Sequence, residues 1–153
     1  MEDDLKIRAA TMDDLPSWLN LYRHLNADDP ILTEADATKI LDQLHKYQGS
    51  KILIGQIGQE IVSTCTLIVI PNLTRGGTPC ALLENVVTNE RHRKRGFASA
   101  ILKAAVEFAW HHGCYKVMLL TGSEEPGTFE FYEKVGFTQS KTGFQIRRIP
   151  TRA

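Results

Sequence analysis

Three basic residues and a glycine stand directly before a stretch with helical periodicity. Residues 93–95 read Arg-Lys-Arg, Gly96 follows, and small side chains return at Ala98 and Ser99. The first backbone N–H groups of a helix have no internal partner, and the helix dipole adds partial positive charge there. Gly96 and Ala98 leave room for an oxygen atom to approach those N–H groups. The pattern therefore predicts a site for a phosphorylated ligand.

The spacing of this segment excludes two common phosphate loops. A Walker loop needs a longer glycine loop closed by Lys-Ser or Lys-Thr, and a dinucleotide fingerprint needs three glycines, whereas only Gly96 is present here. A solvated basic turn before a surface helix is the plain alternative. A nucleic-acid patch is a second alternative, which a net charge of zero and the lack of aromatic residues among the basic ones disfavour.

Four segments, in this order, match one known family. They are the opening Ile7–Leu15, the strand-like Glu84-Asn85-Val86-Val87-Thr88, the loop with Arg93, Gly96 and Ala98, and Phe131-Tyr132-Glu133-Lys134-Val135-Gly136-Phe137. The chain resembles the GNAT (Gcn5-related N-acetyltransferase) family over nearly all of its 153 residues.

The resemblance implies an α+β fold in one domain, residues 1–153. A central mixed and mostly antiparallel sheet would carry helices on both faces, and its bulged fourth strand would splay away from the fifth. The cosubstrate would be acetyl-CoA, lying in that opening as the acetyl donor. The implied contacts are backbone groups of Val86, Val87 and Thr88 for the pantetheine arm, backbone N–H groups of Arg95, Gly96, Phe97, Ala98 and Ser99 for the pyrophosphate, and the charges of Arg93 and Lys94.

Two side chains are expected to move protons. By resemblance Tyr132 lies near the cosubstrate sulfur, and a neutral phenol with a pKa of about 10 can protonate a thiolate whose conjugate acid has a pKa of about 8.5. Packing of Tyr132 in the core is the alternative. Glu84 is expected to accept the proton of the amine, although a salt bridge or a substrate contact fits it equally, and Asn85 shares this ambiguity because a bulge resets strand alternation.

The chain departs from the family at one position. Many members carry Asn seven residues before the tyrosine, and here Glu125 stands there. We expect Ser123 or Thr128 to replace that contact to the pantetheine region.

The periodicity predicts the remaining elements. A strand at Leu5–Ala10, a helix from Leu15 to Leu25 and a second helix capped by Thr33 come first. The rest are a hairpin at Gly58-Gln59 between Lys51–Ile57 and Glu60–Ile70, a helix from Gly96 to His112, a strand at Lys116–Thr121, a helix at Glu125–Val135 and one or two strands within Gly136–Ile149.

Composition sets the remaining expectations. With 42% hydrophobic and 24% charged residues, the chain is typical of a globular protein. An acidic start and the lack of an apolar run of about 20 residues favour a cytoplasmic protein that does not bind membranes. The three cysteines are expected to be reduced structural thiols, and no histidine spacing predicts a metal. A homodimer is expected.

These observations predict an acetyl-CoA-dependent N-acetyltransferase that acts directly on a primary amine of a small molecule. The alternatives are an amino-sugar-phosphate acetyltransferase of the glucosamine-6-phosphate type, a peptide acetyltransferase, and a regulator that binds acetyl-CoA without turnover. The acceptor is expected near Ala27–Ala35, Asn72–Pro79 and the last strands.

Overall fold

The computed structural model describes residues 4–150 and divides into two units, Met1–Leu119 and Leu120–Ala153. The first unit carries a five-stranded sheet in the order β1-β2-β3-β4-β5. Its strands are β1 (Lys6–Ala9), β2 (Lys51–Ile57), β3 (Glu60–Ile70), β4 (Cys80–Thr88) and β5 (Val117–Leu119). Neighbours are antiparallel except β4 and β5, which are parallel. The predicted α+β fold with a mixed sheet is confirmed.

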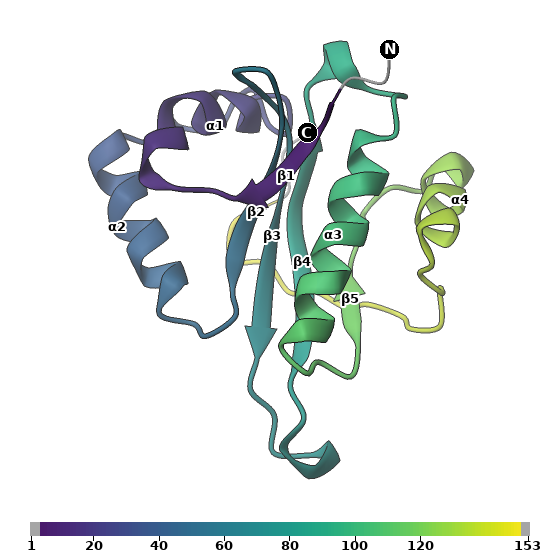
Figure 1. Cartoon of the computed structure of the whole chain (residues 1–153). Helices are drawn as coiled ribbons and strands as arrows, with labels where there is room; N and C mark the ends of the chain where they lie inside the picture. The colour runs from purple at the N-terminus through teal and green to yellow at the C-terminus, as the bar shows by residue number, and fades with distance from the viewer. Residues whose placement is uncertain (1–3, 151–153) are drawn as a thin grey trace. The chain divides into compact units, whose positions relative to one another are not determined.

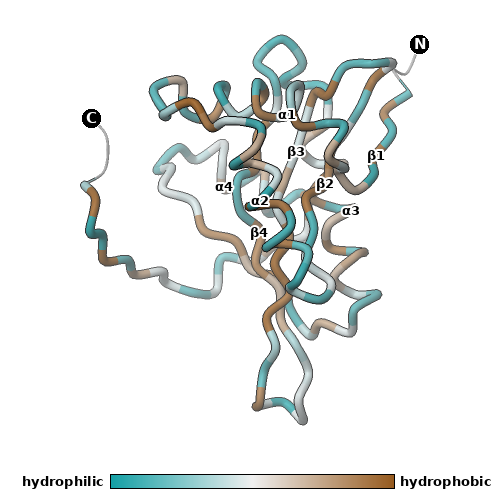
Figure 2. Tube along the Cα trace, turned by 90° about the vertical axis from the view of Figure 1, so that its left-hand side faces the viewer, coloured by the Kyte–Doolittle hydropathy of each residue, from teal (hydrophilic) through white to brown (hydrophobic). Residues whose placement is uncertain are grey.

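Helices cover both faces of this sheet. On one side lie α1 (Leu15–Tyr22) and α2 (Glu34–His45), and on the other lies α3 (Phe97–His111), which packs against β2, β3 and β4 (Figure 1). Apolar residues recur along β2 and β4, shown in brown in Figure 2, as expected for strands covered on both faces.

Local sequence signals explain where several elements begin and end. The hydroxyl of Thr33 accepts the N–H of Asp36 at 3.1 Å and so caps α2, as predicted. The predicted hairpin turns at Gly58 with a φ of 56°, and α3 is followed by Gly113 with a φ of 74°. Both turns need a left-handed backbone, which glycine adopts without strain.

The core between α1, α2 and the sheet takes in one face of each helix. Leu15, Trp18, Leu21, Ala37 and Leu41 are buried there. Ile40 is 52% exposed, because the buried strip of α2 runs along Ala37, Leu41 and Leu44.

The second unit contains α4 (Pro126–Val135), as predicted within one residue. The expected strands within Gly136–Ile149 are wrong, because residues 137–150 contain no strand. Apolar residues alternate at Phe144 and Ile146, but both are almost fully exposed. Alternation alone forms no strand, since a strand needs a neighbour for its backbone groups.

Candidate active site at the open edge of the sheet

Strand β4 is paired along only part of one edge. Its parallel pairing with β5 joins Ala81–Leu83 to Val117–Leu119 and stops there. Beyond Leu83, β4 continues to Thr88 with no strand on that side among the described residues. This opening is the splay that the family resemblance implies.

A bulge lies in β4 at the start of the unpaired stretch. On β3, Thr64 pairs with Val87 and Thr66 pairs with Glu84, so β4 has one residue more than β3 over this interval. Asn85 absorbs the extra length with a φ of 52°, a left-handed backbone that asparagine tolerates better than most residues.

The β3–β4 register shows toward which face of the sheet Glu84 projects. Thr64 and Thr66 are two residues apart and project to one face of the sheet, so their partners Val87 and Glu84 project to that face as well. Val87 is buried in the core beside Trp18 of α1. Glu84, which is exposed, therefore lies on the α1 side of the sheet.

The phosphate loop predicted at residues 93–99 has a distinctive backbone. Lys94 has a φ of 62° and Gly96 a φ of 81°, and Gly96 directly precedes α3. The first bond of the helix runs from the N–H of Ala100 to the carbonyl of Gly96, so the N–H groups of residues 97–99 precede it. Apart from Gly96 and its two chain neighbours, no residue has an atom within 4 Å of a Cβ placed on Gly96. These features fit an anion held by backbone N–H groups.

The basic side chains of the loop are not equivalent. Arg93 donates from Nε to the carbonyl of Thr88 at 3.2 Å and from Nη2 to that of His24 at 3.4 Å. It thus joins the end of β4 to the residues after α1, and the expectation that its charge serves a ligand stays a prediction. Lys94 is exposed.

Arg95 takes part in a network on the other side of the loop. Its Nη1 lies 2.9 Å from Nδ1 of His92, and its guanidinium lies 5.0 Å from the centre of the Phe97 ring. Since a guanidinium only donates, Nδ1 accepts and Nε2 carries the hydrogen. Nε2 lies 3.1 Å from Glu60 Oε2, and Asn89 Nδ2 donates to Glu60 Oε1 at 3.4 Å. Sequence inspection missed this network because Glu60 is far from the loop in the chain.

Two carbonyls of the unpaired stretch are already engaged. Ser63 Oγ donates to the Val87 carbonyl at 3.2 Å, and the Thr88 carbonyl accepts from Arg93. The Thr88 hydroxyl lies 3.0 Å from Ser63 Oγ. The expected pairing of Val86, Val87 and Thr88 with a pantetheine arm stays a prediction.

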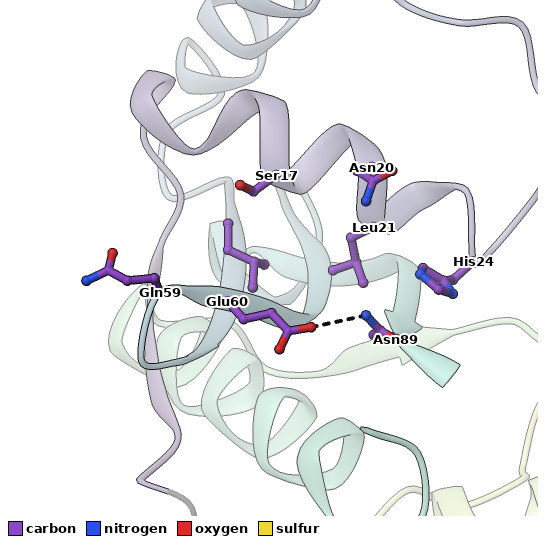
Figure 3. A pocket seen from close by; sticks show the side chains of 8 residues that line it. Ser17, Asn20, Leu21, His24, Gln59, Glu60 and Asn89 are labelled. Carbon is purple, nitrogen blue, oxygen red and sulfur yellow. Dashed lines mark hydrogen bonds between the residues drawn. The ribbon is translucent and has the colours of Figure 1, made fainter. Parts of the chain in front are cut away.

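Two hollows adjoin this region in the first unit. The α1–α2 hollow, of about 550 Å³, is lined by Leu19, Asn20, Tyr22, Arg23, Leu25, Asn26, Asp29, Pro30, Ile31, Leu32 and Asn85. The polar hollow, of about 360 Å³, lies between α1 and the start of β3 and is lined by Ser17, Asn20, Leu21, His24, Gln59, Glu60, Ile61 and Asn89 (Figure 3). The α1–α2 hollow includes part of Ala27–Ala35, where the acceptor was expected, and it reaches the bulge at Asn85.

Tyr22 lies near Thr66, the cross-strand partner of Glu84. It lines the α1–α2 hollow and packs against the core, and burial raises the pKa of its hydroxyl while hydrogen bonding with Thr66 acts in the opposite sense. Thr66 is the residue opposite Glu84. A raised pKa keeps the phenol neutral and able to donate a hydrogen bond. Sequence inspection used Tyr22 only as part of a helix pattern.

The remaining predicted site residues belong to the second unit. The ring of Tyr132 lies 5.1 Å from that of Phe131 and 6.2 Å from that of Phe137, and burial raises its pKa. Ser123 Oγ lies 3.0 Å from Thr128 Oγ1, and the two close the turn that begins α4. Their expected contact with a pantetheine arm stays a prediction.

The three cysteines are free thiols. Cys65 is fully buried, and burial raises its pKa to about 12, while Cys80 and Cys114 are also free thiols. Among residues 4–150, no three His, Cys, Asp or Glu side chains are grouped to hold a metal ion. Within the same range, no helix is both long and apolar enough to cross a bilayer.

The first unit thus combines a half-open mixed sheet, a bulged strand, a loop with left-handed backbone before α3 and an adjoining hollow. The pattern of the Acetyltransferase (GNAT) family matches residues 17–137. The glucosamine 6-phosphate N-acetyltransferase of Trypanosoma brucei brucei is 34% identical over 136 residues, which are 88% of this chain and 89% of that protein.

Solved structures agree with the sequence comparison. A putative acetyltransferase from Agrobacterium tumefaciens superposes with a TM-score of 0.88 at 45% identity, covering 94% of this chain and 99% of the other. Glucosamine-6-phosphate N-acetyltransferase from Arabidopsis thaliana, at 19% identity, shares the fold with a TM-score of 0.86 over 95% and 99% of the two chains.

The chain belongs to the GNAT acetyltransferase family. It is an acyltransferase that transfers an acetyl group to an amine, which confirms the predicted class of enzyme.

Proposed function

We propose that the donor is acetyl-CoA and that the acceptor is a primary amine of a small molecule, acetylated directly. One observation carries this proposal: the left-handed backbone at Lys94 and Gly96 opens the first turn of α3 next to the unpaired stretch of β4. A pyrophosphate fits the first feature and an extended amide-bearing arm fits the second.

The donor is held mainly by backbone groups in this proposal. The N–H groups of Phe97, Ala98 and Ser99 bind the pyrophosphate, and Lys94 adds positive charge. Gly96 provides the space, since nothing lies near its Cβ position. The side chain of Phe97 is buried, so only its backbone can serve the ligand.

Two proton transfers accompany the reaction. A C–N bond forms while the C–S bond of the thioester breaks, so one proton must leave the amine and one must reach the departing sulfur. Glu84, exposed on the α1 side of the sheet, accepts the first directly or through water. Tyr132 donates the second, and its phenol is protonated before the transfer because burial raises its pKa.

An amino-sugar phosphate is the second candidate acceptor. It is supported by the 34% identity to the trypanosomal glucosamine 6-phosphate N-acetyltransferase, over 89% of that protein. A non-catalytic regulator that binds acetyl-CoA is a further alternative, and turnover with any amine excludes it. The cytoplasmic location and the homodimer stay predictions.

The test combines binding and turnover. We expect thermal stabilisation by acetyl-CoA that weakens with added salt, because charged phosphates meet a basic loop, and weaker stabilisation by dephospho-CoA. Release of free thiol over a panel of primary amines then reports transfer. No stabilisation by acetyl-CoA at millimolar concentration would contradict the proposed donor.

A further inference from the structure

If the proposed function holds, the side chains that line the α1–α2 hollow indicate which kind of acceptor binds there. Leu25, Ile31 and Leu32 line it and are 42%, 82% and 40% exposed. Exposed apolar side chains gathered around a hollow are typical of a ligand groove. Leu19 and Tyr22 form its inner side, because both line the hollow and pack against the core.

The charged residues at this hollow do not select a strongly charged ligand. Arg23 and Asp29, of opposite sign, both belong to the lining. The remaining polar lining consists of three asparagines, Asn20, Asn26 and Asn85, and the hydroxyl of Tyr22. The apolar wall is therefore the feature that distinguishes one amine from another.

One end of the hollow lies beside the residues that are proposed to take part in the reaction. Asn85 belongs both to its lining and to the bulge of β4, and Glu84 precedes it on the α1 side of the sheet. An amine directed toward Glu84 and Asn85 places the rest of its molecule along α1 and the segment Asp29–Leu32. A volume of about 550 Å³ is within the range of about 300 to 1,000 Å³ common for small-molecule pockets.

We infer that the acceptor is a primary amine attached to an apolar body, aromatic or branched aliphatic, which lies against Leu25, Ile31 and Leu32. A hydroxyl-rich sugar phosphate is disfavoured there, because its hydroxyl groups lose water against these side chains without gaining partners. The inference concerns the acceptor alone and leaves the donor unchanged.

Acceptor preference is measured with two probes, 2-phenylethylamine and glucosamine 6-phosphate, by release of free CoA from acetyl-CoA. We expect kcat/KM to be at least about tenfold higher for 2-phenylethylamine. In the variants Leu25→Asn and Ile31→Asn, KM for 2-phenylethylamine should rise about five- to twentyfold, and KM for acetyl-CoA should stay unchanged. Ile40→Asn is the matched control, since Ile40 is 52% exposed on α2 but does not line the hollow.

Each other result overturns the inference in a distinct way. Turnover of glucosamine 6-phosphate equal to or above that of 2-phenylethylamine rejects the apolar acceptor and leaves acetyl transfer to an amine intact. Failure of every amine despite acetyl-CoA binding rejects the proposed function itself. If Ile31→Asn converts a dimer to a monomer in light scattering and leaves KM unchanged, the apolar wall is a contact between two copies of the chain.

Discussion

The Nε2 atom of His92 lies 3.1 Å from Oε2 of Glu60, and this pair joins the β2–β3 hairpin to the turn before the phosphate loop. Asn89 also donates to Glu60. One carboxylate thus holds two residues of the segment between β4 and α3, and its removal should leave that segment less ordered.

Glu60→Ala should weaken acetyl-CoA binding about three- to tenfold, because ordering the loop then opposes binding. Glu60→Gln retains a hydrogen-bond acceptor, so its affinity for acetyl-CoA should lie between those of Glu60→Ala and the wild type. Isothermal titration calorimetry measures the Kd. Glu90→Ala, an exposed change in the same turn, is the control. Equal affinity of Glu60→Ala and wild type would remove the pair from any role in the loop.

Gly96→Asp should abolish detectable acetyl-CoA binding. The added carboxylate occupies the open space beside the first turn of α3 and repels a phosphate. Gly113→Asp is a matched control, because Gly113 has a similar φ of 74° and equally open surroundings at the other end of α3. The Gly113→Asp protein should be less stable than the wild type and should bind acetyl-CoA with unchanged affinity. Similar losses of binding in both variants would attribute the effect to backbone strain.

Tyr132→Phe should lower kcat about 10- to 1,000-fold with little change in the Kd of acetyl-CoA. The substitution removes the phenolic hydrogen and keeps the ring contacts with Phe131 and Phe137. Tyr115→Phe, at a tyrosine that is 37% exposed, should leave kcat unchanged. Wild-type turnover in Tyr132→Phe would assign Tyr132 to packing.

Glu84→Gln should separate two roles of that carboxylate. As a base, Glu84 must be ionised, so the variant should lose rate and the acidic limb of its pH–kcat/KM profile should change. As a binder of the ammonium group, it should raise KM for the amine and leave the shape of the profile intact. Glu107→Gln on the exposed side of α3 is the control. A variant equal to wild type in both respects excludes Glu84 from the site.

Asp14→Asn should lower the free energy of unfolding at pH 7 by about 1 to 2 kcal/mol. The pKa of Asp14 is lowered to about 2, chiefly by hydrogen bonds from Arg8. Burial raises this pKa, but the hydrogen bond from the N–H of Thr11 lowers it further. Its folded pKa is below the unfolded value of about 3.9, so its contribution is complete above that value and is lost as the pH falls toward 2.

Urea unfolding at a series of pH values measures the free energy of unfolding of Asp14→Asn and of wild type. The difference between the two free energies should therefore shrink toward zero near pH 2. Asp13→Asn, at the exposed neighbour, is the control. A difference that stays constant between pH 7 and pH 2 would contradict this assignment.

Local rules predicted much of the fold from sequence. The cap at Thr33 and the left-handed turns at Gly58 and Gly113 depend on a few adjacent residues, so they could be recognised in the sequence. Within Gly136–Ile149 the same rules failed, because strand formation requires a distant partner.

The candidate site was predictable in position and less so in detail. The loop and β4 followed from the family resemblance, but Arg93 bonds to His24, which is 69 residues earlier in the chain. The direction of Glu84 depended on the β3–β4 register, and Tyr22 was hidden in an ordinary amphipathic pattern. Such relations arise between segments distant in the chain.

The left-handed backbone of Asn85 also constrains how this enzyme can change during evolution. Gly, Asn and Asp adopt that conformation at the lowest cost, so substitution at the bulge is restricted whatever the acceptor. Leu25 and Ile31 lie outside the sheet and have ordinary backbones. Divergence in acceptor choice among descendants of this sequence should therefore accumulate in the segment after α1, while position 85 remains nearly invariant.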